Sequence, residues 1–297
     1  MPDTATSASA IRSDASPVLA GVSAHAVAHA PWQASLTLRF ADDAGTTRLL
    51  ERRHSGPLRV QKPLYPEGGA VCHAIVVHPP GGVVGGDQLA LDATVGEGAR
   101  AFLTTPGAAK WYKANGRISR QSVRLEAGPG ACIEWMPQET IFFNDAHVDL
   151  EQDIALAADA CYLGCEILCM GRRASGETFR SGRVAQRTRI RRGGRLLWWE
   201  QGALTPHAVA SPLGLDGRSV CATLIAVGAQ LPAAVLAEVR AIGAGEGYGA
   251  TQMKGLLVVR HLGDDSEAAR EIMLAVWRTL RPHLLGRAAF EPRSWRT

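Results

Sequence analysis

Residues 95–103 read VGEGARAFL, a short glycine turn between two strand-like runs. Similar turns occur as AGPGACIEW at 127–135, LAADACYLG at 156–164 and RRGGRLLWW at 191–199. The turns are centred near Gly98, Gly130, Asp159 and Gly194. These centres are about thirty residues apart, a spacing typical of stacked structural repeats. The pattern predicts hairpins stacked around a shared core, as in a β-solenoid or a rolled sheet, although a plain β-sandwich gives similar spacing.

The wider sequence agrees with a β-rich core. From Trp32 onward the dominant period is two, as in SLTLRF and DQLALDATV, which is typical of strands with one buried face. Two later segments, 231–242 and 264–286, instead have helical spacing, and Asp264 with Glu267 fits the N-terminus of the second. We therefore predict a mainly β fold, helically wound or built of stacked β-hairpins, with about two α-helices in the C-terminal third.

Composition indicates a soluble globular protein. Of the 297 residues 46% are hydrophobic and 20% are charged, and the net charge is only +4. Residues 1–31 are rich in Ala and Ser and lack the basic and apolar regions of a secretory signal, so we expect a disordered tail. No polar linker divides residues 32–297, which are predicted to form a single domain. No apolar run is long enough for a membrane helix, and a cytoplasmic protein is expected.

The six cysteines have no CxxC spacing and lie mostly in apolar runs, which predicts reduced core thiols. Cys161, Cys165 and Cys169 are spaced by four, and this ladder has two interpretations. It is either a thiolate cluster for a soft metal or buried packing, and the apolar neighbours favour packing. No HExxH or GxSxG motif occurs, so neither a permanent metal site nor a hydrolase site is visible.

A glycine-rich loop, HPPGGVVGGD, occupies residues 78–87. Its GGxxGG order is followed by a strand-like run and not by a helix, and no Gly-Lys-Ser/Thr follows, so a phosphate-binding loop is excluded. A tight backbone turn is the simplest interpretation. A metal-related role for His78 or Asp87 remains open.

Two acidic residues have unusual surroundings. Glu139 lies in the apolar segment WMPQETIFF, and Glu177 lies beside glycines and arginines in GRRASGETF. A buried carboxylate must be paired, protonated or in contact with ions or water. Glu177 therefore either forms a salt bridge with Arg172 or Arg173, or lines a polar path for ions; Glu139 has the same two alternatives.

Arginines are concentrated between residues 172 and 195 and alternate along RVAQRTRIRR. Arg183, Arg187 and Arg189 are therefore predicted to share one face of a strand. This face is either a solvated sheet surface or a docking surface for an acidic protein partner. Nucleic acid is a weaker alternative, because no aromatic residues interleave with the arginines.

Taken together, the segments resemble the UreD family of urease accessory proteins, also called UreH. The matching segments are GPLRVQKPLYPEG, HPPGGVVGGDQL, LTTPGAAKWY, EWMPQETIFF, GRRASGETF and the terminal PRSWRT. They extend from about Trp32 to the C-terminus. Cys165 stands where family members often carry tryptophan, which weakens any argument for a family cysteine site.

The resemblance implies a scaffold or chaperone without enzymatic activity. Such proteins dock on urease apoprotein and on UreF, which recruits the GTPase UreG, and Ni²⁺ is thought to pass through a polar tunnel toward the urease active site. The resemblance also implies transient Ni²⁺ passage with no permanently bound cofactor and no tightly bound metal, and neither nucleic acid nor a membrane as partner. The residues expected to line the path are Asp87, Thr104, Thr105, Glu139, Ser175 and Glu177. The alternative from another class is a metal-dependent hydrolase on a β scaffold, which requires a fixed metal held by at least three side chains.

Overall fold

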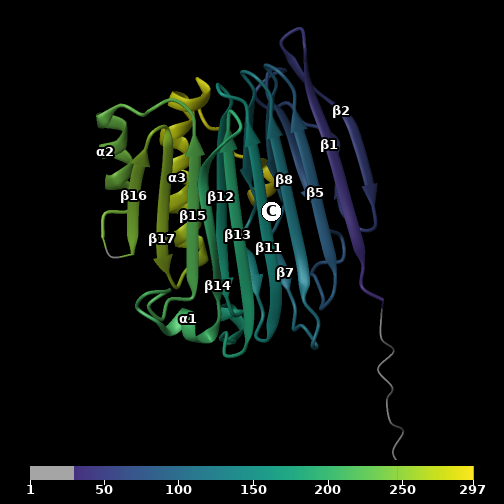
Figure 1. Cartoon of the computed structure of the whole chain (residues 1–297), viewed down its shortest axis with the longest axis vertical. Helices are drawn as coiled ribbons and strands as arrows, with labels where there is room; N and C mark the ends of the chain where they lie inside the picture. The colour runs from purple at the N-terminus through teal and green to yellow at the C-terminus, as the bar shows by residue number, and fades with distance from the viewer. Residues whose placement is uncertain (1–29, 246, 297) are drawn as a thin grey trace, which may run out of the picture. The chain divides into compact units, whose positions relative to one another are not determined.

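The computed structural model describes residues 30–245 and 247–296. The predicted disordered tail, up to residue 29, lies outside the described residues. All described strands and helices belong to one compact unit, Pro31–Thr297. In this unit two β-sheets lie face to face, and helices cover the outer face of one of them (Figure 1).

The two sheets are built mainly from parallel strands with antiparallel strands toward their edges. The seven-stranded sheet contains, in spatial order, β14 (Arg195–Leu204), β13 (Gly182–Arg192), β11 (Ala146–Leu156), β8 (Ser119–Ala127), β5 (Gln88–Val95), β1 (Gln33–Asp43) and β2 (Thr46–Ser55). The ten-stranded sheet contains β16 (Tyr248–Met253), β17 (Leu256–Gly263), β15 (Val220–Val227), β12 (Cys161–Met170), β9 (Cys132–Met136), β6 (Arg100–Thr104), β4 (Cys72–Val77) and β3 (Arg59–Val60). Two short strands, β10 (Thr140–Phe142) and β7 (Ala109–Trp111), extend it beside β12.

The chain winds back and forth between the sheets in successive coils. β5 is followed by β6 and β7, β8 by β9 and β10, and β11 by β12, and equivalent strands of successive coils pair in parallel. The turns at Gly98, Gly130 and Asp159 are the corners where the chain leaves the seven-stranded sheet for the ten-stranded sheet. The predicted stacked, mainly β fold is therefore confirmed, and its coils are those of a β-solenoid.

The fourth turn differs from the other three. It joins β13 to β14 as an antiparallel hairpin within the seven-stranded sheet. Gly193 and Gly194 both have positive φ, 55° and 76°, as a tight hairpin turn of this kind requires. The predicted hairpin is therefore present at this turn, whereas each of the other three turns connects one sheet to the other.

Two apolar layers stabilise the fold, one on each face of the ten-stranded sheet. Between the sheets, inward-facing residues such as Leu36, Leu125 and Ile154 are completely buried. On the other face, Phe102 and Trp277 belong to a second core between the sheet and the helices. Because this sheet is covered on both faces, β12 is a nearly continuous apolar run, CYLGCEILCM.

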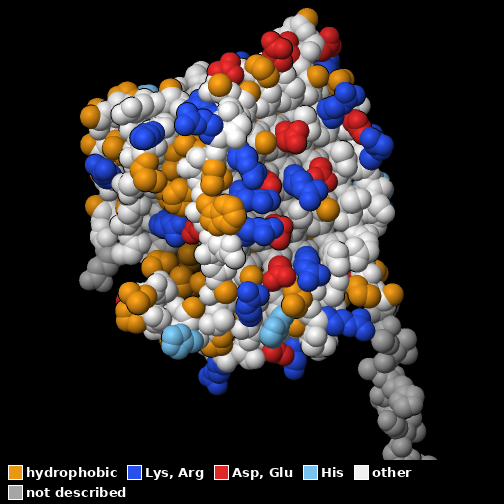
Figure 2. Space-filling view, viewed as in Figure 1, with side chains coloured by type: hydrophobic (Ala, Val, Ile, Leu, Met, Phe, Trp, Pro, Cys, Tyr) orange, Lys and Arg blue, Asp and Glu red, His pale blue; other side chains and the backbone are white. Residues whose placement is uncertain are grey.

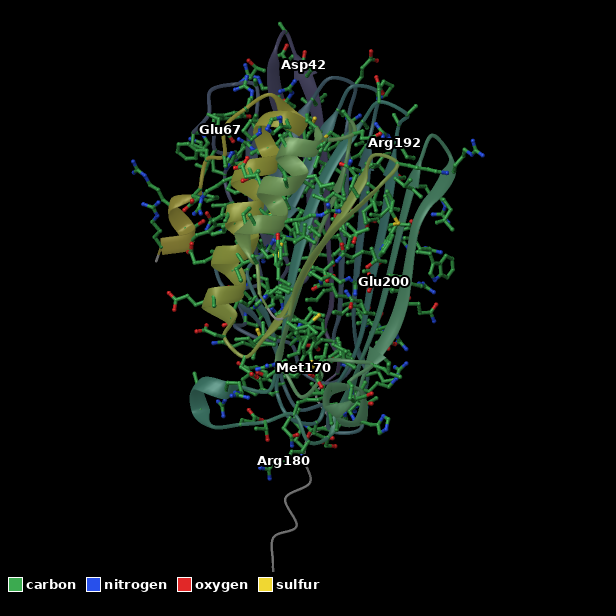
Figure 3. All side chains as sticks on the ribbon, turned by 90° about the vertical axis from the view of Figure 1, so that its left-hand side faces the viewer. Asp42, Glu67, Met170, Arg180, Arg192 and Glu200 are labelled. Atoms are coloured by element: carbon green, nitrogen blue, oxygen red, sulfur yellow. The ribbon has the colours of Figure 1, made fainter. Side chains whose placement is uncertain are left out.

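The α-helices are α1 (Pro206–Ala210), α2 (Ala233–Ile242) and α3 (Ser266–Leu285). Helices α2 and α3 match the two predicted helical segments, and Figure 3 shows them on one side of the stacked sheets. The short helix α1 was not expected; Thr205 caps it, its hydroxyl accepting a hydrogen bond from the amide of Ala208 at 3.2 Å. No helix in the described part of the chain is long and apolar enough to cross a bilayer.

The N-cap of α3 is Asp265, so the prediction of Asp264 was wrong by one residue. The Asp265 carboxylate accepts hydrogen bonds from the amides of Glu267 and Ala268. Asp264 instead accepts from the amide and hydroxyl of Ser219, at 3.1 and 3.0 Å. Both residues fit the local capping pattern, and the contact with the start of β15 determines which of them caps the helix.

Candidate functional site

A partly open cavity of about 250 Å³, here called the internal cavity, lies between the two sheets. Apolar side chains from both sheets, including Leu91, Val123 and Trp135, form most of its wall. The polar side chains on its wall include His78, Thr105, Gln121, Gln138 and Glu166. The polar groups give this mostly apolar cavity several places where water or a small hydrated guest can be held.

Three polar atoms on the cavity wall have no hydrogen-bond partner among the described residues. They are Nε2 of His78, Nε1 of Trp111 and Nε2 of Gln138. Buried polar groups are nearly always hydrogen-bonded to protein or water, so water or a hydrated ion is the natural partner here. Burial lowers the pKa of His78 below its usual value, which favours the neutral imidazole at neutral pH.

Among the described residues, Glu166 of β12 is the only one that brings a carboxylate to the wall of this cavity. Its Oε2 accepts a hydrogen bond from Nε2 of Gln186 at 2.6 Å, and its Oε1 accepts one from Nε2 of Gln152. Burial raises the pKa of Glu166 to about 7, and the charge of Glu200 adds to this effect, while the bonds from the two glutamines oppose it. At neutral pH, therefore, both the charged and the neutral forms of this carboxyl group are populated.

Glu166 also lines a second hollow, of about 200 Å³, beside β14. This hollow contains the Glu200 carboxylate, which accepts a hydrogen bond from Nη2 of Arg260 at 2.5 Å. Leu204, Leu213 and Leu215 supply apolar wall. Because Glu166 belongs to both linings, it stands between the internal cavity and the hollow at the sheet edge; Glu200 is labelled in Figure 3.

Glu166 was not among the site residues expected from the sequence, although its signal was visible. The residue is a single carboxylate in the apolar run of β12, as Glu139 is in its own segment. The Glu166 carboxylate is held by hydrogen bonds from Gln152 and Gln186, which lie on two strands of the opposite sheet. That contact across the sheets is not readable from local sequence.

The six residues expected to line an ion path lie in three different places. Only Thr105 lines the internal cavity; its hydroxyl accepts a hydrogen bond from the amide of Gln138 at 2.9 Å. Thr104 lies on the helix-facing side of the sheet, where its hydroxyl accepts from Nε1 of Trp295 at 2.8 Å. On that side Glu139 pairs with Arg270, with 2.5 Å between Oε1 and Nε.

The remaining three residues lie in loops at the end where strands of the seven-stranded sheet begin. Ser175 is exposed in a short 3₁₀ turn. Oε1 of Glu177 accepts a hydrogen bond from the amide of Asn144 at 2.9 Å, and Oε2 lies 3.4 Å from Nε of Arg172. The salt-bridge alternative for Glu177 is thus present in the structure. The third residue, Asp87, ends the glycine-rich loop.

The carboxylate of Asp87 holds the glycine-rich loop in place. It is 3% exposed and accepts hydrogen bonds from the amides of Trp32 and Val84, at 2.9 and 3.1 Å. Gly86 has a φ of 98°, and a Cβ on Gly85 would lie 1.8 Å from the carbonyl oxygen of Ala114. The loop is therefore a tightly packed turn, and it also forms part of the cavity wall.

Replacing Asp87 by alanine should destabilise the protein, because the amides of Trp32 and Val84 lose their buried acceptor. We expect a decrease of about 1–3 kcal/mol in the free energy of unfolding, measured by urea titration. Asp87→Asn keeps one acceptor oxygen and should lose less. Equal losses for both variants would contradict this account of the loop.

Arg183, Arg187 and Arg189 of β13 face outward from the seven-stranded sheet, and each pairs with an acidic residue of the neighbouring strand β11. The pairs are Arg183 with Asp149 (3.4 Å), Arg187 with Glu151 (2.7 Å) and Arg189 with Asp153. Figure 2 shows basic and acidic side chains intermingled on this face. The positive charge is locally balanced, and a docking role for these arginines stays a prediction.

The cysteine ladder extends along β12, where alternate residues share one face. Steps of four residues place successive thiols about 13 Å apart, too far for one ion. All six cysteines are free, and five are buried. Within residues 30–245 and 247–296 no group of three metal-ligating side chains comes together.

Comparison with known proteins identifies the family. Residues 33–296 match the family described as UreD urease accessory protein. The chain is 62% identical over 271 residues to urease accessory protein UreD of Janthinobacterium sp. (strain Marseille), with 89% of this chain and 92% of the relative covered. It is 53% identical over 274 residues to the protein of the same name from Nitrosospira multiformis, with 90% and 98% covered. The chain therefore belongs to the UreD family of urease accessory proteins.

Proposed function

We propose that this protein is a non-enzymatic cytoplasmic scaffold that binds urease apoprotein and UreF, and through UreF the GTPase UreG, while Ni²⁺ passes through its interior. Family membership gives it an accessory role in urease maturation. The observation that carries the nickel path is Glu166, which lines both the internal cavity and the hollow at the sheet edge. Neither nucleic acid nor a membrane is proposed as a partner.

The donor groups of the cavity suit an ion in transit. Oxygen ligands and water hold Ni²⁺ less tightly than several thiolates or imidazoles would, in line with the high affinity of nickel for nitrogen and sulfur. The cavity wall contains one histidine and no cysteine among the described residues. The unpartnered atoms of Trp111 and Gln138 are hydrogen-bond donors, which orient water around the ion and do not bind the cation themselves.

The proposed path runs from Thr105 past Gln138 to Glu166 and then toward Glu200. Of the six residues first predicted, Thr105 lies on this path and Asp87 holds the wall beside it. We place Ser175 and Glu177 at the loop end, as candidates for transfer between partners. Thr104 and Glu139 act indirectly, since their contacts anchor Trp295 and α3 to the sheet.

The proposal is tested by co-expressing this chain with urease apoprotein and UreF, purifying the complex, and measuring urease activity with added nickel. We expect a stable complex and an activity that depends on this chain. The chain purified without added nickel should hold far less than one equivalent of metal. No complex with unchanged urease activity would refute the scaffold role, and one tightly held metal ion per chain would favour a metal-dependent hydrolase.

A further inference from the structure

Cys132 and Cys161 are brought together by the winding of the solenoid. Each begins its strand, β9 and β12, and the two residues are direct register partners in parallel pairing. They are about thirty residues apart in sequence, which is one coil. The four-residue spacing in the sequence suggested Cys165 and Cys169 as neighbours of Cys161. In the structure its register partner is Cys132, which belongs to the preceding coil.

The pair lies outside both main cores. Together with Leu285 the two cysteines form a separate small cluster, and Leu284 packs against it. Cys132 is 7% and Cys161 6% exposed. The last turn of α3 packs against these cysteines, whereas Cys165 lies in the core between the sheet and the helices.

A positive charge completes the cluster. Arg100 of β6 is the register partner of Cys132, so the order across three successive coils is Arg100, Cys132, Cys161. Nη1 of Arg100 donates a hydrogen bond to the carbonyl oxygen of Leu285, at 2.9 Å. This bond keeps the guanidinium at the end of α3, beside the thiols.

These surroundings make the pair more reactive than the other buried cysteines. The hydrogen bond from the Cys161 thiol, with help from the charge of Arg100 and against the effect of burial, lowers the pKa of Cys132. The pKa of Cys161 is raised in turn, because its thiol donates that hydrogen bond. Burial raises the pKa values of Cys165 and Cys169 to about 12. The thiolate is the reactive form, so Cys132 is the nucleophile of choice.

We propose that Cys132 and Cys161 are a redox-reactive dithiol that a hydroperoxide converts to a reversible intramolecular disulfide. With hydrogen peroxide, the Cys132 thiolate attacks one oxygen, the O–O bond breaks, and the products are a sulfenic acid and hydroxide, which takes up a proton to give water. The sulfur of Cys161 then attacks the sulfenic sulfur and releases the second water. Two electrons pass from the two sulfurs to the peroxide, and a dithiol reductant reverses the reaction.

The Cα spacing of register partners is compatible with a disulfide. Paired residues on adjacent strands have Cα atoms about 5 Å apart, inside the 4.4–6.8 Å range of disulfides. Rotation of the side chains is the main movement required.

The test uses the full-length chain, in complex with its partners if it needs them for solubility, freed of reductant and treated with a small excess of hydrogen peroxide. We expect two of the six thiols to be lost, with a bond between Cys132 and Cys161 as the main cross-link by mass spectrometry. Trypsin leaves both cysteines in the peptide 125–172, so chymotrypsin, which cuts after Tyr162, is needed to separate Cys161 from Cys165. Dithiothreitol should restore all thiols.

Matched variants separate this pair from the other thiols. Cys132→Ala and Cys161→Ala should each abolish the cross-link, whereas Cys165→Ala should leave it unchanged. Arg100→Gln should slow the reaction several-fold, and Arg100→Lys should largely restore its rate. Six intact thiols in the folded wild-type chain, a dominant link involving Cys165 or Cys169, or links only between chains would each overturn the proposal.

Discussion

Replacing Arg281 by methionine is expected to lower the free energy of unfolding by about 3–5 kcal/mol, enough to unfold many domains of ordinary stability. Arg281 is completely buried in α3 between two acidic residues. Its Nε lies 3.0 Å from Oε2 of Glu134, and its Nη1 lies 2.6 Å from Oε2 of Glu67. Methionine keeps much of the aliphatic volume but leaves both carboxylates without their cation.

The surroundings of this network explain the size of the effect. Glu134 is 1% exposed and accepts a further hydrogen bond from Nε1 of Trp277 at 2.7 Å, while Glu67 pairs with Nε2 of His73 at 2.7 Å. Burial raises the pKa of Glu134, and the nearby Arg281 opposes that rise. For Glu67, the hydrogen bonds from His73 and Arg281 outweigh burial and lower the pKa. Removing the arginine thus leaves two buried carboxylates that the remaining bonds from Trp277 and His73 satisfy only in part.

A matched control lies on the same helix. Arg278 pairs with Glu291 at 2.5 Å, but its side chain is 43% exposed, so Arg278→Met should cost less than about 1 kcal/mol. Urea unfolding of both variants gives the comparison. Similar losses for the two substitutions would show that the buried network contributes no more than a surface ion pair.

The repeating turns made the stacked β architecture predictable, but they did not show which of the two sheets each strand joins. Gly98, Gly130 and Gly194 all look like hairpin turns, because local sequence specifies a reversal and not the sheet that the next strand joins. The fourth turn is a true hairpin because β14 pairs back onto β13. Helix α3 was predictable from its apolar stripe, while its cap was misplaced because Ser219 binds Asp264.

The site was less predictable than the fold for a related reason. Apolar neighbours correctly marked Glu139 as a partly buried carboxylate, yet Glu134 and Glu166 carry the same signal. Their roles depend on distant partners: Arg281 lies 147 positions from Glu134, and Gln186 lies 20 positions from Glu166. A single sequence shows which carboxylates are unusual. It does not show which of them pairs with a cationic side chain and which lines a cavity.

The second large effect is expected at Glu166. Replacing it by glutamine keeps the shape of the side chain but removes the one carboxylate that the described residues bring to the internal cavity wall. If Ni²⁺ passes this point, urease activation in the co-expression assay should decrease on the order of tenfold, as for other changes around metal sites. The yield of the complex with urease apoprotein and UreF should be unchanged.

The same substitution should stabilise the protein above neutral pH. The pKa of Glu166 is raised from 4.5 to about 7 in the folded state, so the folded protein binds this proton more tightly than the unfolded chain does. Stability therefore decreases as pH rises from about 4.5 to 7, and the full cost remains above that range. Glu166→Gln avoids this cost, and at pH 8 it should be more stable than the wild type by roughly 1–3 kcal/mol.

Together, the two measurements distinguish an ion path from a structural role. Glu151→Gln is the matched control, since it makes the same chemical change on the outer face of β11, where Glu151 is exposed and pairs with Arg187. It should alter neither urease activation nor the pH dependence of the melting temperature. Suppose that the variant has a higher melting temperature than the wild type at pH 8 but not at pH 5, and that urease is still activated normally. Glu166 is then excluded from the nickel path. If urease activation and the yield of the complex decrease to the same extent, Glu166 instead supports docking of the partners.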